Sequence, residues 1–209
     1  MKKKLMTVLA LVLVIAMSVA GTYAYLTSAD QVVNTFTVGD VQIKLDEAKA
    51  NADGSLVANA DRVKANSYKL LPGHTYNKDP MVTVLKGSES SYVKMTVTFS
   101  NAAELDAIFA PNGADMTSIF NGYDSTNWIY KGNTENTGDN TRTYEFWYKE
   151  AVAAPTADVA LDALFDSITV PGTINNDQLA TIKGMTITVN AYAIQADGFT
   201  DAADAWSHF

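Results

Sequence analysis

Residues 92–99 decide the fold class; they read Tyr92-Val93-Lys94-Met95-Thr96-Val97-Thr98-Phe99. Apolar side chains occupy every second position from Val93 to Phe99, and mostly polar side chains fill the positions between them. A period of two is typical of a β-strand that buries one face and exposes the other. We therefore expect a strand here whose odd-numbered side chains lie in a core.

Similar apolar stretches with β-forming residues recur along the chain. They cover residues 41–46, 81–85, 127–131, 142–149 and 185–195. In the last of these, Ile187, Val189, Ala191 and Ala193 are expected to face the core. Turn-forming Pro72-Gly73 and Pro171-Gly172 separate some of the strands. Many short strands without repeating strand–helix units predict an all-β fold, an antiparallel sandwich formed by residues 41–209.

Short helical insertions are also expected. Asn101, with Glu104 three residues later, is typical of a capped helix start, and Leu105, Ile108 and Phe109 follow at helical spacing. Further helical segments are predicted at 116–120, 160–165, 178–182 and 202–207. The polar residues 48–66 are interpreted as a surface excursion, and residues 132–141 as a loop.

The first residues predict export from the cell. Lys2, Lys3 and Lys4 precede an apolar run from Leu5 to Met17, and small residues follow. This order is typical of a secretory signal peptide over residues 1–24, and the run is shorter than the roughly 20 residues of a membrane span. Cleavage is expected between Ala24 and Tyr25, with the bond after Ala20 as the alternative. The mature protein would be secreted and would not contact the membrane after cleavage.

The net charge and the lack of cysteine exclude several classes of function. The formal charge is −8, and loss of the three lysines of residues 1–24 makes it −11 (−8 − 3). A chain this acidic is not expected to bind nucleic acid or an anionic membrane surface. It has no cysteine, which excludes thiol catalysis and disulfides, so stability must come from packing and backbone pairing.

No catalytic or metal-binding residues are expected, and no cofactor. Zinc peptidases usually need two or three imidazoles at defined spacing, often on a helix with a glutamate base. This chain has only His74 and His208, and neither lies beside a glutamate or at helical spacing from another histidine. A serine nucleophile elbow of the G-x-S-x-G type is also missing from the sequence.

Aromatic residues gather on two neighbouring predicted strands. Trp128, Tyr130 and Trp147 would form a stacking platform for a ligand if they faced the same side. The alternative is that these aromatics are divided between the core and cross-strand pairs.

Several segments carry a family resemblance. They are Gly21–Thr27, Asn34–Gly39, Leu71–Gly73, Lys78–Pro80, Tyr92–Lys94 and Ala191–Ala196. The chain resembles the TasA and camelysin proteins of bacterial biofilm matrices, which are exported with the specialised signal peptidase SipW. The resemblance implies cleavage after Ala24 by an enzyme of that type and a jelly-roll-like fold. It also implies a place in the extracellular matrix or on the cell surface of a Gram-positive-type bacterium.

The resemblance further implies that the extended segment 25–40 can complete the sheet of a neighbouring subunit. A sheet that lacks a strand exposes unpaired backbone groups, and an inserted strand satisfies them. Alternation places Val32, Asn34, Phe36 and Val38 of this candidate donor strand toward a groove. The alternative is that the segment is the first strand of its own sheet.

These observations predict a secreted structural protein that forms fibres with itself or with a related matrix subunit. One alternative is a monomeric surface module that binds a glycan or a host protein. Another is a secreted metallopeptidase of the camelysin type, which the resemblance allows although the histidine spacing does not favour it.

Overall fold

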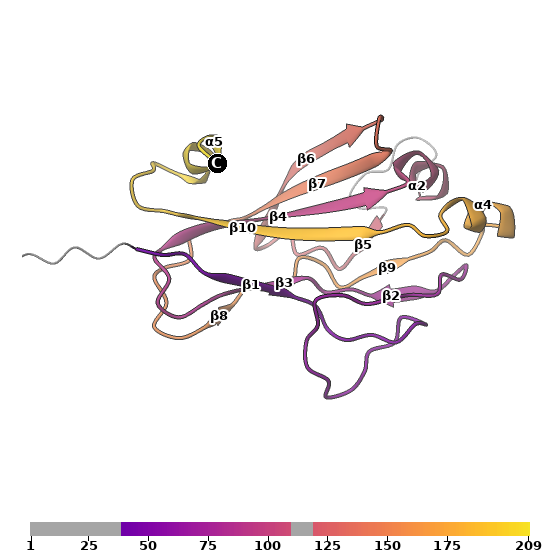
Figure 1. Ribbon diagram of the computed structural model, residues 1–209, viewed down its shortest axis with the longest axis horizontal. Coiled ribbons are helices and arrows are strands. Elements are labelled where there is room, and N and C mark those ends of the chain that lie inside the picture. Colours follow the sequence, from indigo (N-terminus) through magenta and orange to yellow (C-terminus); the bar gives the residue numbers. More distant parts are fainter. Residues whose placement is uncertain (1–38, 110–118) are drawn as a thin grey trace, which may run out of the picture. The chain divides into compact units, whose positions relative to one another are not determined.

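The computed structural model describes residues 39–109 and 119–209, and every structural statement below concerns these residues. Their strands lie in two facing layers of antiparallel sheet, with short helices at the ends (Figure 1). The predicted antiparallel sandwich with helical insertions is confirmed. The predicted signal peptide, its cleavage bond at Ala24 and Tyr25, and the candidate donor strand lie outside the described residues.

The first layer is a four-stranded sheet in the order β10-β4-β7-β6. Its strands are β4 (Ser91–Ser100), β6 (Trp128–Asn136), β7 (Thr141–Tyr148) and β10 (Ile187–Gln195). As the alternation predicts, Val93, Met95, Val97 and Phe99 of β4 are fully buried. The register places Val97 opposite Tyr144 on one side and opposite Val189 on the other.

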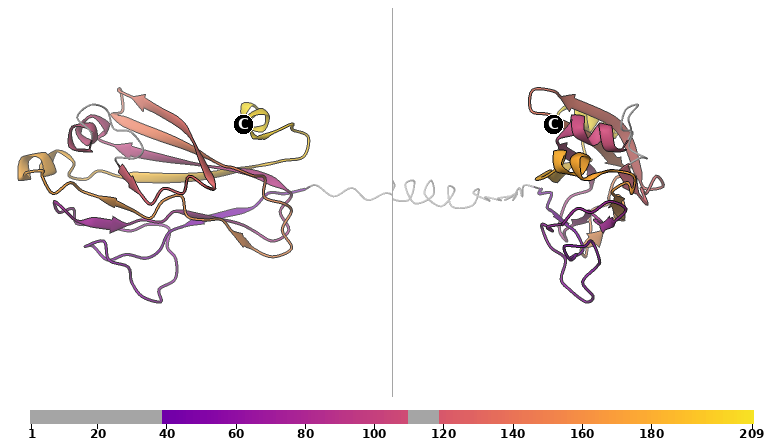
Figure 2. Two further views of the ribbon diagram at one scale, coloured as in Figure 1. Left: turned by 180° about the vertical axis from the view of Figure 1, so that it is seen from behind. Right: turned by 90° about the vertical axis from the view of Figure 1, so that its right-hand side faces the viewer.

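The second layer consists of two three-stranded sheets, in the orders β1-β3-β8 and β2-β9-β5. The strands are β1 (Ile43–Asp46), β2 (Thr75–Asn77), β3 (Met81–Val84), β5 (Phe120–Asn121), β8 (Val159–Ala160) and β9 (Ser167–Thr169). The two sheets lie one after the other beneath the four-stranded layer (Figures 1 and 2). β2, β5, β8 and β9 were not predicted as strands, because two or three residues are too few to show a period.

The loop predicted at 132–141 is wrong over most of its length. β6 continues through Asn136, and β7 begins at Thr141, so the two strands form one long hairpin. A β-bulge between Tyr130 and Gly132, where Gly132 has a φ of 121°, shifts the register. The bulge keeps polar residues such as Asn133 paired with the sheet although they lack the apolar alternation of a strand.

The helices are α2 (Ala102–Phe109), α4 (Asn176–Thr181) and α5 (Ala202–Ser207). The first agrees with the prediction except for its cap. Asn101 has a left-handed φ of 57° and does not cap the helix; instead, Asn140 accepts from Ala102 N–H through its carbonyl (3.0 Å) and from Ala103 N–H through Oδ1 (3.0 Å). The cap of α2 therefore comes from the turn between β6 and β7.

One other helical prediction fails. Residues 160–165 contain no helix, and Leu161, Leu164 and Phe165 instead fill the core from an extended segment. In the segment predicted at 116–120, residues 116–118 lie outside the described part, Ile119 is helical, and Phe120 belongs to β5. The apolar spacing was read as helical, but the same spacing suits a segment that packs irregularly against both sheets.

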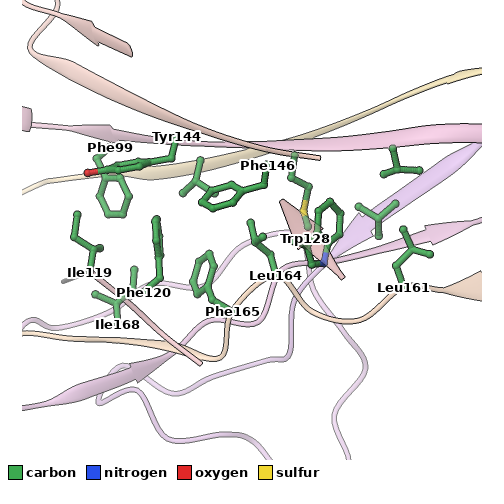
Figure 3. Close-up of a cluster of buried hydrophobic side chains, with 14 of the residues drawn as sticks. Phe99, Ile119, Phe120, Trp128, Tyr144, Phe146, Leu161, Leu164, Phe165 and Ile168 are labelled. Atoms are coloured by element: carbon green, nitrogen blue, oxygen red, sulfur yellow. The ribbon is translucent and has the colours of Figure 1, made fainter. Parts of the chain in front are cut away.

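Aromatic rings dominate the core between the layers (Figure 3). Phe120 lies at the centre, with its ring centroid 4.5 Å from Phe165, 5.4 Å from Tyr144 and 5.9 Å from Phe146. Trp128 is fully buried and donates its indole N–H to the carbonyl oxygen of Asp162 at 3.0 Å. Packing of large rings at these distances stabilises the domain, which has no cysteine and therefore no disulfide.

The core predicts a clear contrast between two neighbouring positions of β7. Replacing Phe146 by Ala should lower the free energy of unfolding by about 3–5 kcal/mol, because a buried ring leaves a cavity. Replacing Glu145 by Ala, one residue away on the outer face, should change it by less than about 0.5–1 kcal/mol. Urea unfolding followed by tryptophan fluorescence measures both, and equal losses would contradict this assignment of faces.

Candidate functional site

The two layers end in open edges on the same side of the sandwich. Among the described strands, β10 pairs only with β4, and β1 pairs only with β3. β1 and β10 lie close to each other across the gap between the layers. Both edges present backbone N–H and C=O groups that no described strand satisfies, which is the usual template for a further strand.

The inner face of β10 is incompletely covered. Ile187, Val189, Ala191 and Ala193 point toward the core, as predicted, but they are only half-buried. Their partners on β4, from Val93 to Phe99, have no exposed surface. Inward residues of β4 are thus fully covered by the second layer, whereas their apolar neighbours on β10 are covered only in part.

Two adjoining cavities, together called the edge groove, follow this uncovered face. The larger has a volume of about 680 Å³ and the smaller about 380 Å³. Asn66, Lys78 and Ile187 line both, so these three residues mark the middle of the groove.

The larger cavity is mainly apolar. It is lined by Tyr68, Leu70, Leu179, Ile182 and Met185. Leu179 is presented by α4, which begins with a capping box in which Asn175 Oδ1 accepts from Gln178 N–H at 2.9 Å. Gly184, with a φ of 80°, turns the chain from α4 into β10, so the cavity lies where β10 begins.

The smaller cavity lies farther along β10. Val189 of β10 faces Leu45 of β1 there, with Val63 and Pro80 beside them. The groove thus has a large, mainly apolar end next to α4 and a smaller end beside Val189, where apolar side chains are mixed with the charged Asp46 and Lys64.

A buried ion pair forms the polar centre of the groove. Lys78 Nζ lies 2.5 Å from Glu47 Oε2, and the two side chains are only 10% and 7% exposed. Asn66 Nδ2 donates to Glu47 Oε1 at 3.0 Å, while Asn66 Oδ1 accepts from Ala50 N–H at 2.9 Å. Burial, together with the charge of Glu47, raises the pKa of the Tyr68 phenol, which keeps this side chain neutral.

A second set of charges holds the excursion 48–66 against the sandwich. Arg62 Nε donates to Asp46 Oδ1 at 2.6 Å, and its Nη1 donates to Asp79 Oδ2 at 2.9 Å. Burial alone would raise the pKa of Asp46, but hydrogen bonds from Lys44 and Arg62 outweigh it and lower the pKa. Since Asp46 also lines the groove, this network fixes the wall of the smaller cavity.

The predicted ligand platform does not form from Trp128, Tyr130 and Trp147. The register pairs Ile129 with Trp147 and Tyr130 with Phe146. Trp128 and Tyr130 therefore share the inner face, and Trp147 lies on the outer one. The alternative division between core and cross-strand packing is the one observed.

Sequence reasoning missed an aromatic cluster on the outer face. Lys94 Nζ lies 4.5 Å from the ring centroid of Trp206 in α5 and 4.7 Å from that of Phe209. Trp147 packs 6.4 Å from Trp206 on the same face. The cluster attaches the C-terminal helix to the sheet. In the sequence, the only local sign of it was that Lys94 lies on the polar, outward face of its strand.

The histidines lie at exposed positions. His74 follows the turn at Gly73 and packs beside Tyr76, and His208 contacts the carbonyl oxygen of Asp204 near the C-terminus. Within residues 39–109 and 119–209, no group of three or more His, Asp or Glu side chains could hold a metal ion. In the same ranges no helix combines the length and apolar character needed to cross a membrane.

Comparison of the chain with protein-family models, with curated proteins and with solved structures gave no match. The function proposed below therefore rests on the edge groove and on the sequence.

The Asp46–Arg62 network predicts a pH-dependent stability. Asp46→Asn should lower the free energy of unfolding at pH 7 by about 1.5–3 kcal/mol, the range for hydrogen bonds to charged groups. The folded-state pKa of Asp46 is lowered, so its contribution is complete above the ordinary aspartate range and is lost as the pH falls through the folded value. The difference between wild type and variant should therefore shrink below about pH 4.

Urea unfolding at pH 7 and at stepwise lower pH measures this difference. Asp61→Asn is the matched control, because Asp61 is exposed and next to Arg62. A gap between wild type and Asp46→Asn that stays constant down to the lowest pH would contradict the role given to this carboxylate.

Proposed function

We propose that this protein is an exported structural subunit of a cell-surface or biofilm-matrix fibre. In the fibre, the N-terminal segment of each subunit occupies the edge groove of its neighbour. The observation that carries the proposal is the half-buried inner face of β10 beside an open groove, next to a fully buried face on β4.

The location of the first described residues supports a head-to-tail arrangement. Asp40 accepts through its carbonyl from Glu89 N–H at 2.9 Å, and Ser90 accepts from Ala196 N–H at 2.7 Å. Residue 40 thus lies where β10 ends, whereas α4 and the large cavity lie where β10 begins (Figure 1). A segment that leaves one subunit at the first end would reach the groove of a neighbour at the opposite end.

Such a contact joins two different surfaces, so it does not close on itself after one step. Repeated addition gives an open filament instead of a closed dimer. Residues 25–38 span about 46 Å when extended at roughly 3.3 Å per residue, which is longer than the nine-residue strand β10. The segment therefore has the reach to cover the groove.

The chemistry of the groove suits the expected donor face. Val32, Phe36 and Val38 are apolar, and both ends of the groove are lined by aliphatic side chains. Burying a valine or phenylalanine side chain contributes about 1.5–3 kcal/mol, so three of them give a stable contact without any disulfide. The negative net charge of the chain also helps to keep separate subunits soluble before the strand is inserted.

The first test changes the donor segment. In mature protein beginning at Tyr25, Phe36→Asp should abolish fibres, since burying an unpaired carboxylate in an apolar site costs several kcal/mol. Thr35→Asp, one residue away on the opposite face, should still form fibres. Negative-stain electron microscopy shows the outcome, and unchanged filaments from Phe36→Asp would overturn strand donation.

The second test changes the groove and uses both variants together. Val189→Arg should block the groove, whereas Ile129→Arg, on the exposed outer face of the opposite edge strand β6, should not. A mixture of Val189→Arg, which keeps its donor segment, with Phe36→Asp, which keeps its groove, should give one-to-one heterodimers. Native mass spectrometry and size-exclusion chromatography detect them; circular dichroism checks that each variant is folded, and a mixture that stays monomeric contradicts the proposal.

A further inference from the structure

We infer that Lys78 sets the register of the inserted strand by binding the side-chain oxygen of Asn34 from the neighbouring subunit. This inference rests on the proposed function and specifies which donor residue lies at which point of the groove. It starts from the one charged side chain that lines both cavities, Lys78.

The ammonium of Lys78 has unused hydrogen-bonding capacity. It carries three N–H donors, and in the described part of the chain its recorded acceptor is Glu47 Oε2. The side chain is only 10% exposed, so bulk water has little access once the groove is filled. A buried ammonium with too few acceptors is costly, and an inserted strand that supplies one is favoured over a strand that does not.

The groove has three successive levels along the start of β10. Met185 lines the large cavity, Ile187 lines both cavities, and Val189 lines the small one. Inward-facing residues of a strand are about 6.8 Å apart, so an adjacent strand offers one inward side chain at each level. Lys78 also lines both cavities and therefore belongs to the middle level, with Ile187.

The direction of the inserted strand follows from the ends of the domain. In the proposed head-to-tail arrangement the donor subunit lies beyond α4, because the large cavity lies beside α4 and residue 40 of each subunit lies at the other end of the fold. Phe36 of the donor then lies level with Met185, residue 38 lies beyond it on the side of α4, and earlier residues lie deeper. The donor consequently runs antiparallel to β10, as the other strand pairs of this layer do.

With this direction, each inward side chain of the donor meets a part of the groove of similar size and polarity. Phe36 falls in the 680 Å³ cavity, and Val32 falls in the 380 Å³ cavity. Asn34 falls between them, beside Lys78, and it is the one polar residue among the four donor positions. Glu47 already balances the charge of Lys78, so a neutral amide oxygen fits this place better than a second carboxylate.

The contact makes one register preferable. A slip of two residues keeps the same side chains inward, and apolar fit alone discriminates weakly against it. After such a slip, Val32 or Phe36 would meet Lys78 and leave its ammonium without the added acceptor. A buried ammonium that is short of an acceptor is a penalty against the slipped pairing.

A peptide of residues 25–38 tests the contact, with mature Phe36→Asp protein as the acceptor because its own donor segment is impaired. Isothermal titration calorimetry gives the affinity. Asn34→Leu in the peptide should weaken binding by about tenfold or more, the range expected when a charged group loses a hydrogen bond. Thr35→Val, on the opposite face, should leave the affinity within about twofold.

The same peptides on altered acceptors complete a double-mutant cycle. With Lys78→Met, the penalty for Asn34→Leu should disappear. Because Lys78→Met leaves Glu47 buried and unpaired, the double variant Glu47→Leu/Lys78→Met provides a second acceptor in which neither charge remains. On this acceptor, Asn34→Leu should bind at least as well as the unchanged peptide.

The results separate the inference from the proposed function. If the unchanged peptide binds and Asn34→Leu binds equally well to the acceptor with Lys78 intact, the register contact is overturned and strand donation stands. A tenfold penalty that persists on the double variant overturns it as well, because Asn34 would then act elsewhere. If the unchanged peptide does not bind at all, the proposed function itself fails.

Discussion

A β-sandwich is stable only where each layer covers the apolar face of the other up to its last strand. In this protein the four-stranded layer meets that condition at β4, where every inward side chain is buried, and fails to meet it at β10. Both the edge groove and the proposed polymer follow from this one incompletely covered strand. The aromatic core around Phe120 makes the rest of the domain strong enough to tolerate it.

The groove is not a uniform apolar slot. It contains a buried ion pair between a larger, mainly apolar cavity and a smaller one of mixed polarity, so it is divided into segments of different size and polarity. Buried charges contribute little net stability when compared with well-packed apolar residues, and their best-attested use is to specify one arrangement among several. The Lys78–Glu47 pair suits such a role, because strands slide past each other easily and a filament needs the same pairing at every joint.

Local alternation was enough to predict much of this fold. β4, β10 and α5 were expected from the sequence with nearly their observed bounds, since their patterns depend only on residues within each segment. Pairing between distant segments could not be predicted. The continuation of β6 through Asn136 depends on a bulge at Gly132, and the separation of Trp128 from Trp147 depends on the register between two strands.

The groove was beyond sequence reasoning for the same reason. Alternation correctly identified the inward face of β10, but it does not reveal that no described strand follows on its far side. Lys78 and Glu47 are separated by 31 positions, and neither has a neighbour in sequence that marks it as buried. The antiparallel pairing of β1 with β3, which places Asp46 opposite Met81, brings them together.

The cap of α2 has a consequence for the order in which the chain folds. An eight-residue helix is too short to be stable by itself, and the first amides of α2 are satisfied by Asn140, at the turn of the β6–β7 hairpin. Residues 102–109 precede that turn in the chain, yet the first amides of α2 gain their partner only when the hairpin has closed. We therefore expect α2 to become stable no earlier than the β6–β7 hairpin.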